Sequence, residues 1–152
     1  DIAMPGYKCN MTDINAAIGL AQLRRYDSEI LTKKDLINTW YKKYLGDIKG
    51  VILPEFRPED KVSSRHIYAL RLEGATEEKR NEVIQKLAEK GIATNVHFQP
   101  LPLLTAYKNL GFKIEDYPEA YAMYSTEISL PFHDFVSEED VIYIAKCLKE
   151  VL

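Results

Sequence analysis

The chain is poor in cysteine and contains no long apolar run. Its two cysteines, Cys9 and Cys147, lie near opposite ends of the 152 residues. They have neither the paired spacing of a zinc site nor the density of a disulfide-stabilised scaffold. No apolar stretch approaches the roughly 20 residues with which a helix crosses a membrane. We therefore expect reduced, structural thiols, a cytoplasmic location and no membrane partner.

The chain also lacks an excess of either charge. Its 20 lysines and arginines and 23 aspartates and glutamates are interspersed and leave a net charge of −3, which excludes the basic patch of a nucleic-acid-binding protein. A P-loop, a dinucleotide fingerprint and a nucleophile elbow are absent. The three histidines, His66, His97 and His133, do not have the spacing of metal ligands. We expect neither a nucleic-acid partner nor a metal site.

The composition is that of an ordinary globular protein. Hydrophobic residues make up 46% of the chain, which at this length suffices for one domain with its own core. The sequence starts at Asp1 without an initiator methionine or a signal peptide, as an internal piece would. We expect residues 1–152 to form a single domain of a longer protein.

Helical periodicity dominates the first third of the chain. Thr12 is a good N-cap, and apolar residues follow at helical spacing over about 12–45, with a break or bend near Asp27-Ser28. Two further amphipathic helices begin after the caps Thr76 and Ser137. Gly19, in mid-helix, costs about 1 kcal/mol relative to Ala. It therefore predicts that another backbone, from this chain, a missing domain or a second subunit, passes close by.

Alternating apolar residues predict three strands, at 66–73, 92–98 and 127–132. The segment 51–64, rich in proline and charge, is predicted to be a surface loop. A helix joins the first two strands, and the short third strand lies between them. The prediction is an α+β fold: a long N-terminal helical region, then a small, mostly antiparallel three-stranded sheet with helices on one side.

Two polar residues near the N-terminus are candidates for ligand binding. Asn10 precedes the Thr12 cap, beside free N–H groups that suit an anion such as phosphate. Asn is also a common turn residue, and the residues alone favour that role. Lys8 is the only lysine in a suggestive place, since the others fall mostly on polar helix faces.

Two histidines are candidates as well. His97 comes just before the rigid turn Gln99-Pro100-Leu101-Pro102, which could hold it at the edge of a site. His66 follows Arg65 and could face an anion or simply pack. The residues alone favour structural roles for both.

The order of motifs along the chain resembles DegT-type sugar aminotransferases, which use pyridoxal phosphate (PLP). The opening segment carries Gly-Tyr-Lys-Cys-Asn-Met-Thr-Asp-Ile followed by Ala-Ala-Ile-Gly and Gln-Leu, over residues 6–23. The later matching motifs are Arg65-His66-Ile67-Tyr68, Gly91-Ile92, His97-Phe98-Gln99-Pro100-Leu101 and Ile128-Ser129-Leu130-Pro131. Cys9 replaces the family's usual aromatic residue, and Pro102 stands where a second histidine often occurs, so a two-histidine substrate contact is in doubt.

The resemblance implies the small C-terminal domain of a fold-type I enzyme, whose large PLP domain precedes this chain. Active sites would lie between the subunits of a homodimer. The lysine that bonds to PLP would lie upstream, so we expect no catalytic residue here and no activity from the fragment alone. Asn10 would bind the PLP phosphate of the neighbouring subunit. His97, with His66 and Lys8, would bind the substrate.

The implied activity is transfer of an amino group, from a donor such as glutamate, to a keto group of a nucleotide-linked sugar. Such a reaction serves surface polysaccharide or amino-sugar biosynthesis. A PLP-dependent sugar dehydratase of the same family remains an alternative, because the residue that distinguishes it is not in the chain. A non-catalytic small-molecule-binding α+β module is the other alternative.

Overall fold

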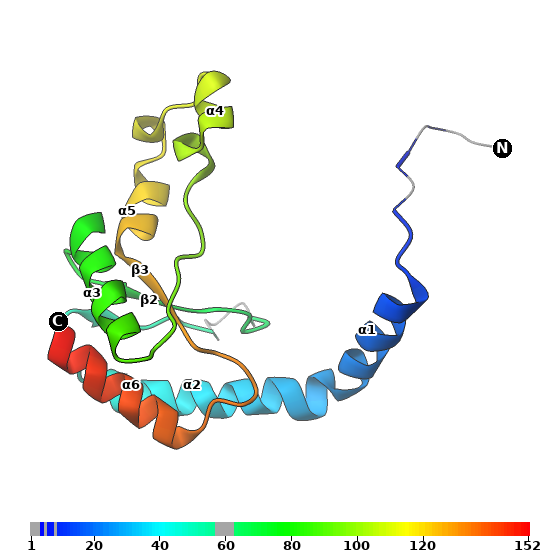
Figure 1. Ribbon diagram of the computed structural model, residues 1–152, viewed down its shortest axis with the longest axis horizontal. Coiled ribbons are helices and arrows are strands. Elements are labelled where there is room, and N and C mark those ends of the chain that lie inside the picture. Colours follow the sequence, from blue (N-terminus) through cyan, green and yellow to red (C-terminus); the bar gives the residue numbers. More distant parts are fainter. Residues whose placement is uncertain (1–3, 5, 8, 57–62) are drawn as a thin grey trace.

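The computed structural model describes residue 4 and residues 6–7, 9–56 and 63–152. Lys8 lies outside the described residues. The elements are α1 (Asp13–Arg25), η1 (Tyr26–Leu31), α2 (Thr32–Leu45), β1 (Val51–Ile52), β2 (Tyr68–Leu72), α3 (Glu77–Glu89), η2 (Leu101–Leu103), α4 (Thr105–Asn109), η3 (Ile114–Asp116), α5 (Pro118–Thr126), β3 (Glu127–Leu130) and α6 (Glu138–Val151). The predicted α+β fold, with a long N-terminal helical region and a small antiparallel sheet, is confirmed (Figure 1).

The sheet has the order β1-β2-β3, and both pairs are antiparallel. One of its strands differs from the prediction. β1 lies at the start of the segment that we predicted to be a loop, where Val51 and Ile52 pair with Leu72 and Arg71. A strand of two residues is too short for alternation to be recognised in the sequence.

The segment 92–98 lies beside β3, as predicted, but the prediction that it forms a strand is wrong. It forms a single bridge, Asn95 to Ser129. The N–H of Val96 donates instead to the Asn95 side chain at 2.8 Å, and that of His97 donates to the Glu127 carboxylate at 2.9 Å. A ladder that continued from the Asn95–Ser129 pair would use the His97 N–H next, but that donor is taken by a side chain, so the segment is extended without being a strand.

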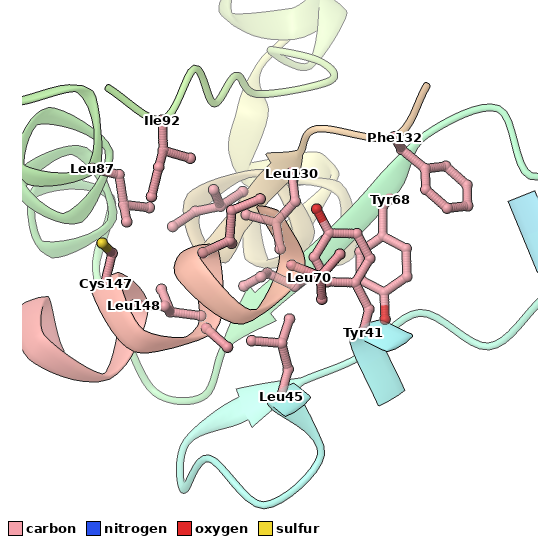
Figure 2. Packing of buried hydrophobic residues seen from close by; sticks show 14 of the residues in the cluster. Tyr41, Leu45, Tyr68, Leu70, Leu87, Ile92, Leu130, Phe132, Cys147 and Leu148 are labelled. Carbon is pink, nitrogen blue, oxygen red and sulfur yellow. The ribbon is translucent and has the colours of Figure 1, made fainter. Parts of the chain in front are cut away.

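The apolar face of the sheet packs against the long helices α2, α3 and α6. Tyr68 and Leu70 of β2 lie opposite Leu130 and Ile128 of β3, and all four are buried. Figure 2 shows Tyr68, Leu70 and Leu130 converging with residues from the helices and from the segment after β3, among them Tyr41, Leu45, Leu87, Phe132, Cys147 and Leu148. The burial of Cys147 confirms it as a structural thiol, whereas Cys9 is exposed.

The other face of the sheet is polar, and we call it the polar face. It carries Ala69 and Arg71 from β2 and their partners Ser129 and Glu127 from β3. The helix α5, which leads directly into β3, borders this face. The predicted ligand-binding histidine, His97, lies here.

The N-terminal helix α1 leaves the body of the molecule and buries none of its residues (Figure 1). The predicted break or bend near Asp27-Ser28 coincides with a π-helical turn, η1, which interrupts the α-helix and continues directly into α2. Leu31, just before α2, has helical backbone angles and makes no side-chain cap. A Cβ added at Gly19 would meet no described atom within 4 Å, so the backbone predicted to approach this glycine is not among the described residues.

The three predicted N-caps are confirmed. Thr12, Thr76 and Ser137 each accept a hydrogen bond from the backbone N–H three residues later. No helix within the described ranges is both long enough and apolar enough to span a membrane.

Candidate functional site

His97 is held on the polar face by two buried residues of β3, Glu127 and Ser129. Its backbone N–H donates to Glu127 Oε2 at 2.9 Å, and its ring Nδ1 lies 2.8 Å from Ser129 Oγ. The Ser129 hydroxyl in turn donates to Glu127 Oε1. We call these three residues the His97 network. One carboxylate therefore anchors both the backbone and, through the serine, the ring of His97.

The first of two cavities beside His97 has a volume of about 420 Å³. His66 and His97 both line it, together with Ser129 and the turn Pro131-Phe132. The structure thus brings together two of the residues that were predicted to bind the substrate, although 31 positions separate them along the chain. His66 is exposed and His97 is half-buried.

The second cavity, of about 630 Å³, lies between the polar face, β1 and α5. Its lining combines three charged groups, Glu55, Arg71 and Glu127, with aromatic and apolar side chains, among them Phe98 and Tyr124. Pockets that combine apolar walls with a few polar groups are typical of small-molecule sites. The apolar walls suit a flat or apolar part of a ligand, and Arg71 could pair with an anionic part.

Tyr124 is a hydrogen-bond donor in this site rather than an acid or base. Burial, followed by the hydrogen bond to Glu77, raises the pKa of its hydroxyl. That hydroxyl donates to Glu77 Oε1 at 2.6 Å. Tyr124 therefore stays protonated and ties α5 to α3.

Lys34 lies beside the first cavity. Its Nζ donates to the backbone oxygen of Arg65 at 2.7 Å and lies 5.2 Å from the ring centroid of Phe132. Burial lowers the pKa of its ammonium group. Since its Nζ bonds to the backbone that leads into His66, Lys34 fixes the wall of the cavity.

Four residues of the site were not predicted from the sequence: Glu127, Ser129, Arg71 and Lys34. Glu127 and Ser129 alternate on a predicted strand, which was a usable signal that they share a face. No comparable signal marked Lys34, because it comes from α2, far along the chain from His66.

Asn10 is not part of this site. It is exposed, and the segment before α1 extends away from the sheet (Figure 1). Within the described ranges, no cluster of three or more His, Cys, Asp or Glu residues could hold a metal ion.

Comparison with known proteins places these residues in a family. The family model of the DegT/DnrJ/EryC1/StrS aminotransferases matches residues 2–149. The spore coat polysaccharide biosynthesis protein SpsC of Bacillus subtilis is 33% identical and covers 100% of this chain. GDP-perosamine synthase of Caulobacter vibrioides is 29% identical over 97% of it. The chain spans 39% of the length of each of these two relatives.

The solved structures agree. Spr1654 of Streptococcus pneumoniae, in its PLP form, superimposes with a TM-score of 0.92 at 50% identity, over 99% of this chain and 38% of that protein. The same protein has also been solved in the PMP form. The predicted cofactor, PLP, is thus the one that this relative holds.

Proposed function

This chain belongs to the DegT/DnrJ/EryC1/StrS aminotransferase family, and we propose that it is the C-terminal part of a PLP-dependent sugar aminotransferase. The full-length enzyme transfers an amino group, from a donor such as glutamate, to a keto group of a nucleotide-linked sugar. The observation that carries the proposal is the match to Spr1654 along almost the whole chain. The names of SpsC and GDP-perosamine synthase support amino-sugar and polysaccharide biosynthesis.

The chain provides supporting contacts for the cofactor rather than a complete site. When bound, PLP supplies the electron sink for the reaction. No lysine lines either cavity beside His97 among the described residues, which is compatible with our proposal that the lysine that bonds to PLP belongs to another part of the enzyme. Asn10 is exposed just before the N-terminus of α1, whose first N–H groups have no intrahelical partner. Both features fit a contact to the cofactor phosphate.

Asn10 makes this contact in a homodimer, to the cofactor bound mainly by the neighbouring subunit. Asn10 precedes α1, which leaves the body of the molecule (Figure 1), and it lines neither of the two cavities beside His97; both observations support a partner outside this domain. The exposed apolar residues Ile14 and Ile18, which lie one turn apart on α1, support the same arrangement, because exposed apolar residues that share a helix face pack against protein.

The substrate lies at the polar face. His97 and His66 contact the sugar from the first cavity, and Lys8, on the N-terminal segment that carries Asn10, contributes to the sugar site of the neighbouring subunit. Arg71 and Phe98, in the second cavity, suit an anionic group and a base, the two recognisable parts of a nucleotide.

An isotope-transfer assay tests the proposal. The full-length protein with PLP is incubated with ¹⁵N-glutamate and a panel of nucleotide-linked keto sugars, and the products are identified by mass spectrometry. We expect ¹⁵N in an amino sugar and one equivalent of 2-oxoglutarate. Loss of a sugar hydroxyl without nitrogen transfer would identify a dehydratase, and no reaction with any donor would refute an enzymatic role.

A further inference from the structure

The His97 network determines which nitrogen of the imidazole carries a proton. A serine hydroxyl has one hydrogen to donate, and Ser129 donates it to Glu127. Ser129 Oγ can therefore only accept at its contact with His97 Nδ1, 2.8 Å away. Nδ1 must carry the proton, which leaves Nε2 of the neutral ring as an acceptor.

The remaining nitrogen is free for a ligand. Among the described residues, Nε2 of His97 has no hydrogen-bond partner, and the residue lines both cavities. Glu127 and Ser129 are 6% and 5% exposed, so water competes little for their hydrogen bonds and the arrangement is rigid.

We propose that Glu127 and Ser129 are positioning residues that hold His97 as the Nδ1–H tautomer, so that Nε2 accepts a hydrogen bond from a hydroxyl of the ligand. That this ligand is a sugar rests on the proposed function; the tautomer does not. The histidine would then orient the sugar by accepting, and a sugar with no donor at this position would bind less well.

Nuclear magnetic resonance of the 152-residue chain tests the tautomer. The two ring nitrogens of His97 are distinguished by their ¹⁵N shifts at about pH 8.5, well above the ~6.5 of an ordinary imidazole. We expect Nδ1–H in the parent chain and in Ser129→Thr, which keeps the hydroxyl, and a shift toward Nε2–H in Ser129→Ala. The control is Ser125→Ala, since Ser125 is also buried but its hydroxyl donates to Ala122. An Nε2–H tautomer in the parent, or an unchanged tautomer in Ser129→Ala, overturns the proposal.

Kinetics of the full-length enzyme test the ligand contact. Loss of one hydrogen bond to a neutral partner corresponds to about a three- to tenfold change in binding. We expect Ser129→Ala to raise KM for the sugar by this factor with little change in kcat, and Ser129→Thr and Ser125→Ala to leave KM unchanged. If His97→Ala raises KM and Ser129→Ala does not, the positioning role is refuted. If neither variant changes KM, His97 does not bind the sugar, and the proposed sugar contact is refuted. The proposed tautomer is then decided by the ¹⁵N spectra alone.

Discussion

The guanidinium of Arg80 lies 4.8 Å from the ring centroid of Tyr124 and donates to that residue's backbone oxygen at 2.7 Å. The same nitrogen donates to the backbone oxygen of Glu127 at 3.1 Å. Arg80, on α3, is 1% exposed. It therefore fixes the junction at which α5 ends and β3 begins, and with it the strand that carries the His97 network.

Replacement of Arg80 by methionine is expected to lower the free energy of unfolding by about 3 kcal/mol. The backbone oxygens of Tyr124 and Glu127, one partly and one fully buried, lose a charged donor, and such hydrogen bonds contribute roughly 1.5–3 kcal/mol each. Urea denaturation of the 152-residue chain measures the change. The control is Lys79→Met, one residue earlier, where a half-exposed ion pair with Glu82 predicts a loss of at most about 1 kcal/mol. Equal losses in the two variants would contradict this role for Arg80.

The N-terminus of α6 predicts a pH-dependent contribution to stability. Hydrogen bonds from the Ser137 backbone and side chain hold the pKa of the Asp140 carboxyl below its usual range. A lowered folded-state pKa means that this stabilisation is complete above the unfolded value of about 3.9 and is lost as pH falls through the lower folded value.

Asp140→Asn should therefore be less stable than the parent at neutral pH, and the difference should shrink as the pH falls below about 4. Thermal unfolding at a series of pH values measures it. Glu139→Gln is the control, because Glu139 lies in the same turn but is no part of the capping box. A difference from the parent that does not vary with pH would exclude the carboxylate as its source.

His97→Ala in the full-length enzyme should raise KM for the sugar by about three- to tenfold, the effect of one lost hydrogen bond. If His97 only packs, the same change should lower the melting temperature and leave KM normal. Both quantities should be measured on the same preparation. His133→Ala is the control, since His133 is exposed and lines neither of the two cavities.

Asn10→Ala in the full-length enzyme should weaken PLP retention by roughly ten- to a hundredfold, because a hydrogen bond to a charged phosphate contributes about 1.5–3 kcal/mol. Dialysis followed by absorbance of the bound cofactor measures the loss.

Mixed dimers decide which subunit makes the Asn10 contact. One subunit carries Asn10→Ala, and the other lacks the lysine that bonds to PLP. The subunit with Asn10→Ala keeps its lysine and receives its Asn10 contact from the partner, so its site should retain PLP normally. Retention as weak as in the Asn10→Ala homodimer would show that the contact is made within one chain.

The 152-residue chain alone should show no aminotransferase activity and form no specific covalent adduct with PLP. Lys34 is the strictest test, because burial lowers its pKa, which favours the nucleophilic amine. Its Nζ is nevertheless bonded to the Arg65 carbonyl. After borohydride treatment, peptide mapping should find no stoichiometric modification at Lys34 or at any other single lysine; one such site would refute the prediction.

Local signals in the sequence were sufficient for the helices. The caps Thr76 and Ser137 were predictable because each bonds within its own first turn. The sequence did not show that the segment 92–98 would fail to form a strand, because the acceptor that takes the His97 N–H is the side chain of Glu127, 30 residues away. The alternation of apolar and polar residues indicates which side chains are buried, but it does not indicate which acceptors the backbone N–H groups bond to.

The candidate site was only partly predictable, because some of its contacts also join residues that are far apart in the sequence. His66 and His97 could be chosen from their motifs, and the fold places them on one cavity. The function of Ser129 depends on its hydrogen bond to His97, which joins β3 to the segment beside it. Such a relation exists only once the two segments lie side by side.

The π-helical turn Tyr26–Leu31 accommodates one residue more than an α-helical turn would hold. In an uninterrupted α-helix, each residue advances the chain by about 100° about the axis, so one extra residue would rotate α1 by that angle relative to α2. The wider π turn absorbs the extra residue and avoids most of this rotation. Ile14 and Ile18 therefore face nearly the side that they would face in an uninterrupted helix one residue shorter. The conformation of this turn is therefore a determinant of how the domain can be joined to a neighbour.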